Sequence, residues 1–340
     1  MKNIGLIFET NSKIGGGHFW RCFNLAKILN HKSGKIYFIS NKLEKNFKKI
    51  LKKENFNFYK IKSLKSISEI KSIIIKEKIQ IFISDYYGLS SQNKKKIKEF
   101  IDTLIVIDDH INKKHFCDIY INNNFLTDSS KNKIKKFNPN TKLLLGTKFF
   151  IHDKKYFKLK NKNKNIKRIN KIFAFFGSSD PTNETLKFIR SIKNFKNIKF
   201  QILVGRINKN YKKIKKYCKN KKNIKIFYNL TNYNTLKLMK GNNLSFGSGG
   251  INLTERLFSG LVSVAICTAK NQKNALIALN KRKIIHYLGE SKNVNHFMIK
   301  NCIRSFLENM NNFYALQKKT YHYYKKNNNI DLISRELKFN

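Results

Sequence analysis

Short runs of hydrophobic residues alternate along this chain with longer stretches in which hydrophobic residues recur every three or four positions. The runs at 79–84 and 104–107 are almost uniformly apolar, which is typical of strands buried on both faces inside a parallel sheet. The longer stretches predict amphipathic helices. Because the two kinds of segment alternate, the pattern predicts an α/β fold in which helices cover parallel sheets.

The alternation occurs twice, which predicts two domains. A first domain over 1–156 has predicted strands at 3–9, 35–40, 56–61, 79–85, 103–108, 117–122 and 142–146, with helices that include 18–30, 42–53 and 91–101. A second domain over 171–326 has predicted strands at 171–176, 198–204, 224–228, 243–246, 262–267 and 284–287, with helices near 181–193, 209–219, 251–259, 272–282, 293–308 and 312–326. The charged, low-complexity segment 157–170 predicts a linker, and 327–340 a C-terminal tail. A ligand cleft is expected between the two domains, at the carboxyl ends of their strands.

The net charge of +51 comes from 71 Lys and Arg residues against 20 Asp and Glu residues, and nearly all of the basic residues are Lys. Proteins that read nucleic acid usually rely on the planar fork of Arg. Lys, Asn and Ile are abundant together while Pro is scarce, so the charge favours compositional drift. We therefore expect no nucleic-acid partner, and a polyanion-binding surface stays open as the alternative.

Neither a membrane segment nor a metal site is expected. No hydrophobic run approaches the roughly 20 residues that a membrane helix needs, and the N-terminus lacks a signal-peptide pattern. The cysteines form no Cys-x-x-Cys pair, which predicts reduced thiols in a cytoplasmic protein: Cys22, Cys117, Cys218, Cys267 and Cys302. Four histidines without ligand spacing are interpreted as structural: His115, His152, His286 and His296. The sequence indicates no cofactor and leaves the oligomeric state open.

A glycine-rich turn, Gly15-Gly16-Gly17, separates the first predicted strand from the first predicted helix. Glycines allow the backbone to approach a ligand closely, and a helix N-terminus presents free N–H groups to phosphate. His18 follows this turn, where an imidazole can accept a proton from water near neutral pH. The alternative is a tight turn with a surface histidine.

A similar turn follows the first strand of the second domain and contains Gly177, Ser178 and Ser179. Pro181 suits the first turn of the next helix, and Ser179 or Asp180 suits its N-cap. Serine hydroxyls and open N–H groups there can hold a diphosphate. The alternative is an ordinary capped helix start.

A third glycine-rich turn, in the second domain, consists of Ser248, Gly249 and Gly250. Glu255 follows in the next predicted helix, where a carboxylate can accept two hydrogen bonds from a ribose diol while the turn amides meet phosphate. It can equally be a solvated helix charge. Asn271 and Gln272 follow a later strand, and their amides suit sugar hydroxyl or acetamido groups unless they are ordinary surface.

Acidic and aromatic residues follow two strands of the first domain, in the segments 84–88 and 108–110. Strand ends of such sheets face the ligand site. Asp109 and either Tyr86 or Tyr87 are therefore expected to orient the histidine of the first turn or the departing group. An aspartate at a strand end can also simply form a turn.

These motifs, in this order, resemble the nucleotide-sugar hydrolase family of pseudaminic acid biosynthesis, which acts on UDP-2,4-diacetamido-2,4,6-trideoxy-β-L-altropyranose. The family's most specific element, G-x-G-H-x-x-R-C-x-x-L-A, is matched by Gly15, Gly17, His18, Arg21, Cys22, Leu25 and Ala26. Its D-x-Y-G, paired-aspartate and C-D-x-x-x-N elements are matched by Asp85, Tyr87, Gly88, Asp108, Asp109, Cys117, Asp118 and Asn122. Its G-x-S-D-P-x-N and K-N-Q elements are matched by 177–183 and 270–272. The resemblance covers most of residues 3–290.

The resemblance implies two Rossmann-like domains in a GT-B-like arrangement, related to the inverting transferase that adds N-acetylglucosamine to lipid I. It also implies that His18 is the catalytic base and that Glu255 holds the uridine ribose. This chain departs from the family at Asp153, where many members carry Arg, and at 249–250, which replace a serine-rich turn. The helices beyond about residue 290 match nothing in the family.

The sequence thus predicts hydrolysis of a UDP-linked 2,4-diacetamido-2,4,6-trideoxyhexose, with water attacking the anomeric carbon and UDP leaving. The predicted catalytic residues are His18, Tyr87 and Asp109. The predicted substrate- and UDP-binding residues are Gly15, Gly16, Gly17, Arg21, Gly177, Ser178, Ser179, Ser248, Gly249, Gly250, Glu255, Asn271 and Gln272. Two alternatives remain: a sugar transferase that uses an acceptor hydroxyl in place of water, and a polyanion-binding protein without catalysis. The Lys-rich segment 60–100 lacks the apolar helix face that an acceptor groove of the transferase often carries.

Overall fold

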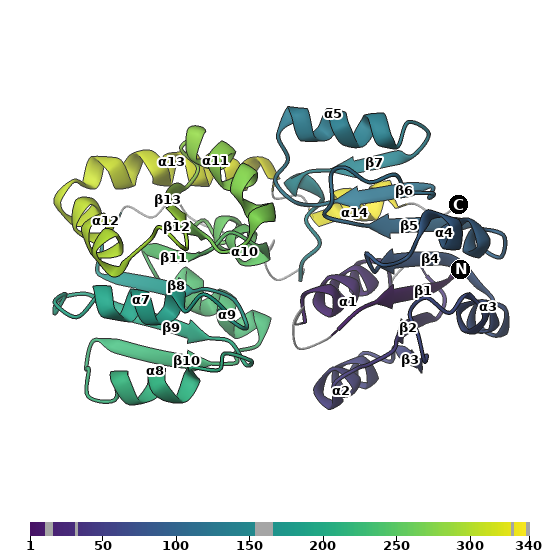
Figure 1. Cartoon of the computed structure of the whole chain (residues 1–340), viewed down its shortest axis with the longest axis horizontal. Coiled ribbons are helices and arrows are strands. Elements are labelled where there is room, and N and C mark those ends of the chain that lie inside the picture. Colours follow the sequence, from purple (N-terminus) through teal and green to yellow (C-terminus); the bar gives the residue numbers. More distant parts are fainter. Residues whose placement is uncertain (11–15, 31–32, 154–165, 328–329, 338–340) are drawn as a thin grey trace. The chain divides into compact units, whose positions relative to one another are not determined.

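The computed structural model describes residues 1–10, 16–30, 33–153, 166–327 and 330–337, and the chain divides into two compact units. The first unit comprises Met1–Lys154 with Asn329–Asn340, and the second comprises Lys155–Asn328. Figure 1 shows the two units, each built from one sheet and its covering helices. Gly15 and the greater part of the predicted linker lie outside the described residues.

The first unit contains a seven-stranded sheet in the order β3-β2-β1-β4-β5-β6-β7, and every neighbouring pair is parallel. Its strands are β1 (Asn3–Phe8), β2 (Ile36–Ser40), β3 (Asn57–Lys60), β4 (Ile79–Asp85), β5 (Thr103–Ile107), β6 (Ile119–Asn122) and β7 (Lys142–Leu145). The prediction of a parallel sheet from the uniformly apolar runs is confirmed here.

Both faces of this sheet are buried, which explains why its strands lack a polar side. The covering helices are α1 (Gly17–Leu29), α2 (Lys45–Lys53), α3 (Ile67–Lys76), α4 (Ser91–Lys98), α5 (Asp128–Phe137) and α14 (Ile330–Glu336), and a short 3-10 helix spans Thr147–Phe149. Leu6 of β1 lies in a core with α1, α2 and α14, whereas Ile7 lies in the opposite core with α3, α4 and α5.

The C-terminal segment differs from the predicted tail, because it folds into α14 and packs on the first unit. Ile333 and Leu337 are buried in the same core as α1. Figure 1 shows this yellow helix beside the teal strands of the first unit. The chain therefore completes one face of its N-terminal sheet with its last helix.

The second unit contains a six-stranded parallel sheet in the order β10-β9-β8-β11-β12-β13. Its strands are β8 (Lys171–Phe175), β9 (Lys199–Val204), β10 (Ile224–Tyr228), β11 (Leu244–Ser248), β12 (Val262–Cys267) and β13 (His286–Glu290). Its helices are α7 (Glu184–Ser191), α8 (Tyr211–Cys218), α9 (Asn232–Lys240), α10 (Ile251–Phe258), α11 (Lys273–Lys281), α12 (His296–Glu308) and α13 (Met310–Asn327), with a 3-10 helix at Lys270–Gln272.

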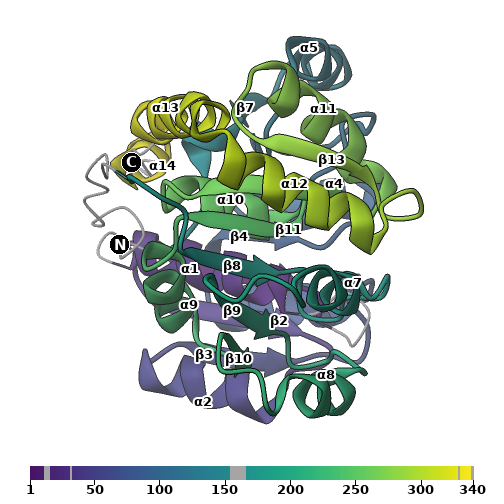
Figure 2. The same cartoon turned by 90° about the vertical axis from the view of Figure 1, so that its left-hand side faces the viewer.

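The core of the second unit lies mainly between its sheet and α7, α8, α12 and α13. Phe188 of α7 and Phe246 of β11 are fully buried there, with ring centroids 5.2 Å apart. Met239 of α9 packs with Phe173 on the opposite face. Figure 2 shows α7 and α8 on one side of these strands and α9 on the other.

The strand order of each sheet grows outward in both directions from its first strand, so β1 and β4 are neighbours, as are β8 and β11. Ligands of such sheets bind at the carboxyl ends of the strands, at this switch point. The glycine-rich turns after β1, β8 and β11 all lie at such ends. No helix of the described ranges combines the length and apolar character needed to span a bilayer.

Candidate functional site

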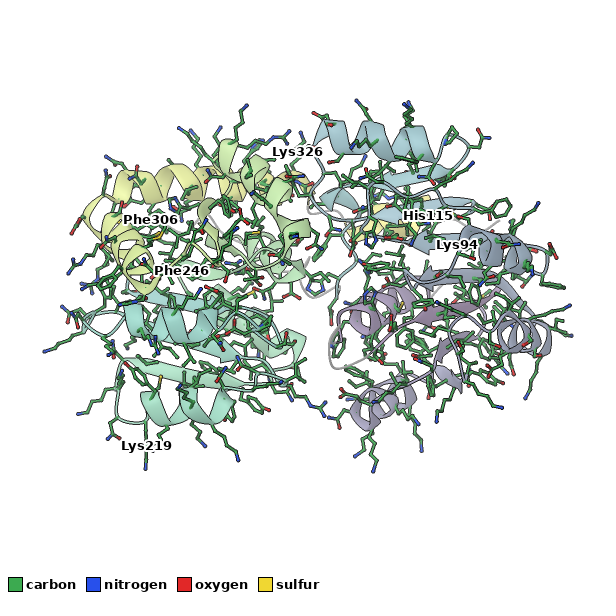
Figure 3. All side chains as sticks on the ribbon, viewed as in Figure 1. Lys94, His115, Lys219, Phe246, Phe306 and Lys326 are labelled. Carbon is green, nitrogen blue, oxygen red and sulfur yellow. The ribbon has the colours of Figure 1, made fainter. Side chains whose placement is uncertain are left out.

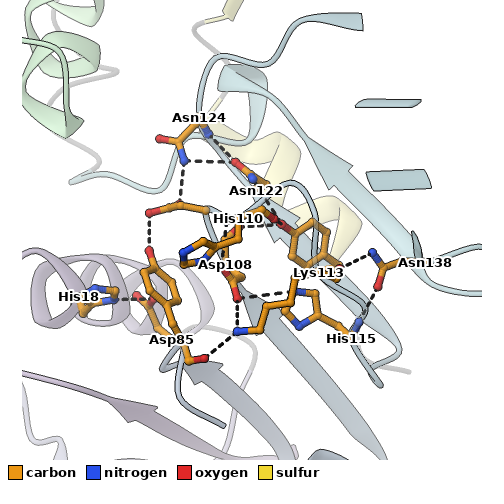
Figure 4. Close-up of polar contacts among 12 residues, drawn as sticks. His18, Asp85, Asp108, His110, Lys113, His115, Asn122, Asn124 and Asn138 are labelled. Atoms are coloured by element: carbon orange, nitrogen blue, oxygen red, sulfur yellow. Dashed lines mark hydrogen bonds and ion pairs between the residues drawn. The ribbon is translucent and has the colours of Figure 1, made fainter. Parts of the chain in front are cut away.

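His18 lies in the first turn of α1, and its ring is fixed by the end of β4. The Nδ1 atom is 2.8 Å from Oδ1 of Asp85, whose side chain is fully buried. Arg21, one helical turn further along α1, donates from Nε and Nη2 to the same carboxylate at 2.7 and 2.5 Å. The beginning of α1 and the end of β4 thus meet at the buried carboxylate of Asp85, and Figure 4 shows its contact with His18.

The charge on Asp85 determines how His18 is presented. Burial by itself raises the pKa of Asp85, but the guanidinium of Arg21 and the ring of His18 outweigh burial and hold that pKa below its ordinary value. The carboxylate is therefore ionised and accepts the Nδ1–H of His18. With Nδ1 protonated, Nε2 of a neutral imidazole carries the lone pair, which is the arrangement that a general base requires.

Tyr87 and Asp109 extend this network toward the end of β5. The Tyr87 hydroxyl donates to Oδ2 of Asp109, and Arg21 donates from Nη1 to Oδ1 of Asp109 at 3.0 Å. Asn124 donates to the same oxygen at 2.7 Å. The Tyr87 ring also lies edge-on to the ring of His18, with centroids 4.9 Å apart. Asp109 and Tyr87 therefore form one unit that borders the imidazole.

A second network is centred on Asp108, which is 1% exposed at the end of β5. Its Oδ1 accepts from the backbone N–H of His110 at 2.9 Å and lies 2.6 Å from Nδ1 of the same residue. Its Oδ2 accepts from Nζ of Lys113 at 3.1 Å, and that ammonium also donates to the carbonyl of Tyr87 at 2.6 Å. Burial raises the pKa of Asp108, but His110 and Lys113 hold it below its ordinary value.

Lys94 of α4 and His115 lie behind Asp108, away from solvent. Nζ of Lys94 is 3.0 Å from Nδ1 of His115, and Nε2 of His115 is 3.5 Å from Oδ2 of Asp108. Figure 3 places these two side chains next to each other beside α4. Burial lowers the pKa of Lys94 to about 8, and burial together with Lys94 lowers the pKa of His115 to about 3. The histidine ring, stacked on Tyr120 at 4.9 Å, is thus neutral.

The turn after β8 contains three residues with a positive φ, which are Gly177, Asp180 and Asn183. Gly177 has a φ of 95°, which a residue with a side chain rarely adopts. The helix predicted from 181 instead begins at Glu184, because Asn183 takes a left-handed conformation with a φ of 58°. Asp180 caps α7 from outside by accepting the N–H groups of Glu184 and Thr185, each at 2.9 Å. The prediction that Pro181 occupies the first helical turn is wrong.

The turn at 248–250 is held from two sides. Arg256 of α10, fully buried, donates to the carbonyl of Ser248 at 2.8 Å and to that of Val264 at 3.1 Å. Oε1 of Gln272 accepts the N–H of Gly249 at 3.3 Å. A Cβ on Gly249 would lie 2.7 Å from the side chain of Leu276 in α11, so any larger residue requires that buried leucine to move. The turn is therefore rigid and closely packed.

The remaining predicted residues of the second unit have mixed surroundings. Glu255 is half-buried on α10, and Asn252 donates to its Oε2 at 3.3 Å. Ser178 and Asn271 are exposed, and Ser179 is half-buried. Ser178, Ser248 and Glu255 lie at the carboxyl-end side of one sheet, where anionic ligands of parallel sheets bind.

The geometry bears on three predictions about the first unit. The residue that contacts Nδ1 of His18 is Asp85, whereas Asp109 with Tyr86 or Tyr87 was expected to orient His18 or the departing group. Arg21, predicted to bind the substrate or UDP, is 5% exposed, and its guanidinium donates to Asp85, Asp109 and Tyr87. Of the two tyrosines, Tyr87 meets the imidazole, while Tyr86 packs against the core on the α3 side of the sheet.

Four residues of these networks were not singled out by the sequence, or were interpreted as structural: Lys94, His110, Lys113 and His115. The only local signal was their position in the chain, because Lys94 follows β4 and the other three residues follow β5. Gly16 and Gly17 begin α1 directly before His18. Within the described ranges, no group of three or more His, Cys, Asp or Glu side chains is placed to hold a metal ion, and all five cysteines are free.

Comparison with known proteins finds two that are distantly similar to this chain in sequence. It is 28% identical over 276 residues to UDP-2,4-diacetamido-2,4,6-trideoxy-beta-L-altropyranose hydrolase of Campylobacter jejuni, covering 81% of this chain and 94% of that protein. It is 27% identical over 284 residues to the uncharacterized protein MJ1062 of Methanocaldococcus jannaschii, covering 77% of this chain and 55% of that protein. No family model matches the chain.

Solved structures confirm the predicted fold of two Rossmann-like domains. MurG of Acinetobacter baumannii superposes with a TM-score of 0.65 and 11% identity, covering 98% of this chain and 100% of that one. A UDP-glucosyltransferase of Polygonum tinctorium superposes with a TM-score of 0.70 and 10% identity, covering 96% and 93%. These neighbours are glycosyltransferases of the GT-B type, and the likeness at this identity concerns the fold.

Proposed function

We propose that this protein is a UDP-sugar-processing enzyme that hydrolyses a UDP-linked 2,4-diacetamido-2,4,6-trideoxyhexose to UDP and the free sugar. The observation that carries the proposal is the imidazole of His18, held through Nδ1 by the buried carboxylate of Asp85 at a strand end. The distant relationship to a hydrolase of that substrate, which extends over 94% of its length, supports the choice of reaction.

In the proposed reaction, His18 acts as the base. The oxygen of a water molecule bonds to the anomeric carbon while the bond from that carbon to the diphosphate oxygen breaks. The electron pair leaves with UDP, and the proton of the water passes to Nε2 of His18. The imidazolium that forms is stabilised by Asp85, which lies 2.8 Å from Nδ1. Positioning and proton transfer of this kind account for large rate gains without a cofactor.

The other proposed roles follow from the contacts of each side chain. Tyr87 and Asp109 border the imidazole and contact the sugar. Arg21 has a positioning role, because it donates hydrogen bonds to the carboxylates of both Asp85 and Asp109. In the second unit, we assign the diphosphate to the backbone N–H groups and serines of the turns at 177–179 and 248–250. Glu255 accepts the ribose hydroxyls, because a half-buried carboxylate on the helix after such a turn suits a diol.

The decisive experiment incubates the protein with a panel of UDP-linked diacetamido sugars and no acceptor, and monitors UDP and free sugar. We expect both products from the wild type. His18→Asn should lower turnover by about 10²- to 10⁴-fold, while the Kd for UDP changes less than about twofold. His322→Asn, at an exposed histidine of α13, is the matched control and should keep full turnover.

Other outcomes have definite meanings. Equal turnover in His18→Asn would remove the imidazole from the mechanism. UDP release that requires an added acceptor would identify a transferase, the activity that the MurG-like neighbours carry. Absence of any UDP release, together with steeply salt-dependent binding of a polyanion, would identify a non-catalytic binding protein.

A further inference from the structure

The first unit carries a second aspartate–histidine pair, one strand away from His18. His110 lies directly after β5, and its Nδ1 is 2.6 Å from Oδ1 of Asp108. His18 and Asp85 form the same pair at β4, with 2.8 Å between the corresponding atoms. In both pairs the aspartate is buried and lies within hydrogen-bond distance of Nδ1 of the imidazole. The carboxyl edge of this sheet thus holds two imidazoles through their Nδ1 atoms (Figure 4).

The surroundings of Asp108 define the hydrogen-bonding state of His110. Asp108 is ionised, because the hydrogen bonds from His110 and the ammonium of Lys113 hold its pKa below the ordinary value despite burial. The Nδ1–H of His110 therefore donates to this carboxylate. When the ring is neutral, the remaining nitrogen, Nε2, carries the lone pair and can accept a hydrogen bond. The contact of Nδ1 with Oδ1 of Asp108 at 2.6 Å orients the ring, and the backbone N–H of His110 donates to the same oxygen at 2.9 Å.

Tyr87 connects the two imidazoles. Its ring lies edge-on to His18 with centroids 4.9 Å apart, and edge-on to His110 with centroids 5.0 Å apart. A hexose whose anomeric carbon is near His18 and whose N-acyl arms extend along Tyr87 therefore reaches His110. The side chain of His110 is 58% exposed, whereas that of His18 is 12% exposed. An imidazole this exposed contributes little to the core, although the aspartate that orients it is buried and also accepts a hydrogen bond from Lys113.

We propose that His110 is a specificity-determining residue that contacts the sugar of the substrate. Its Nε2 accepts a hydrogen bond from an N–H or hydroxyl group of that sugar, and an acetamido N–H is the donor that the proposed substrate offers. This inference rests on the proposed function for the identity of the sugar. His110 is not required to move a proton, so its contribution lies in binding.

The test compares binding of UDP with binding of the UDP-linked diacetamido sugar by calorimetry, in a His18→Asn background that keeps the sugar intact. The ratio of the two Kd values measures what the sugar adds. One hydrogen bond corresponds to about a 3- to 10-fold change in Kd. We expect His110→Ala to lose this factor for the UDP-sugar and to keep the Kd for UDP.

Two further variants separate contact from orientation. In His110→Asn, the side-chain amide replaces Nδ1–H toward Asp108 and offers nothing at the position of Nε2, so the same loss as in His110→Ala is expected. In His110→Gln, the longer amide reaches the position of Nε2, so part of the affinity should return. His322→Ala controls for removal of an exposed imidazole, and melting temperatures of all variants check that the first unit is folded.

Each result bears on the inference. An unchanged Kd ratio in the three His110 variants, an equal loss for UDP and the UDP-sugar, or a wild-type ratio of one would each overturn it. Turnover of the wild-type protein tests the proposed function separately. A protein that binds the UDP-sugar through His110 but releases no UDP would refute the hydrolase and retain the inference.

Discussion

Asp85→Asn is the substitution for which the structure gives the sharpest expectation. It preserves the shape of a fully buried side chain and removes the charge that pairs with both His18 and Arg21. Arg21 is 5% exposed, so the guanidinium cannot regain water when its partner is neutralised. One perturbation therefore reports on stability and on catalysis at once.

The size of the stability effect follows from the contacts. Removing one partner of a buried ion pair costs about 3–5 kcal/mol. Asp109 still pairs with Arg21 at 3.0 Å but is 27% exposed, so the lower end of that range applies. A loss of about 3 kcal/mol lowers the melting temperature by roughly 6–12 °C for a unit of this size. Because an asparagine no longer fixes the Nδ1–H tautomer of His18, turnover should also fall by about 10²- to 10⁴-fold.

Calorimetry of thermal unfolding and a UDP-release assay measure these effects. Asp128→Asn is the matched control, because Asp128 is 78% exposed in its pair with Lys131 and should contribute less than about 0.5 kcal/mol. A loss of stability below about 1 kcal/mol, with turnover close to wild type, would refute the reasoning about this ion pair.

The difference in the free energy of unfolding between wild type and Asp85→Asn should depend on pH in a definite direction. The folded-state pKa of Asp85 lies below its ordinary value, chiefly because Arg21 and His18 outweigh the effect of burial. The stabilisation is therefore fully present above the unfolded pKa of about 3.9 and is lost as the pH falls through the lower folded value. The gap between wild type and Asp85→Asn should stay constant near neutrality and shrink only in acid.

Two other predictions concern His115 and Gly249. Burial together with Lys94 lowers the pKa of His115 to about 3. Between about pH 6.5 and pH 3 the unfolded chain therefore binds a proton at this residue that the folded chain does not bind. The free energy of unfolding should fall by up to about 1.4 kcal/mol for each unit by which the pH is lowered through that range. His115→Phe keeps the stacking on Tyr120 and should flatten urea-unfolding stability over that range; an unchanged slope would contradict the assignment. Gly249→Ala forces its Cβ against Leu276 and should cost about 1–3 kcal/mol while weakening UDP binding. Gly241→Ala, whose Cβ meets its nearest atom at 3.6 Å, should be close to neutral, and equal effects in the two variants would contradict the packing argument.

The hydrophobic pattern of the sequence did not predict several helices, or misplaced their beginning, for physical reasons. The helices α3, α5 and α9 were not singled out, because each is short and its charged or polar residues outnumber or interrupt the hydrophobic ones. The beginning of α7 was placed three residues too early, since Pro181 and Asp180 look like a helix start. Only the left-handed backbone of Asn183 moves that start to Glu184. Local signals of this kind are easily overridden by one residue in an unusual conformation.

The amino-acid sequence by itself determined the parallel sheets, since strands buried on both faces must be uniformly hydrophobic, and it placed His18 after a glycine turn at a strand end. It did not determine the partners of that histidine. Arg21 is separated along the chain by 64 residues from Asp85 and by 88 residues from Asp109. These side chains meet only when β1, β4 and β5 become neighbours in the sheet. The same holds for Lys94 with His115, and for α14, which covers the N-terminal sheet from the far end of the chain. Burial and charge pairing act between residues that the fold brings together, and no local pattern encodes which ones those are.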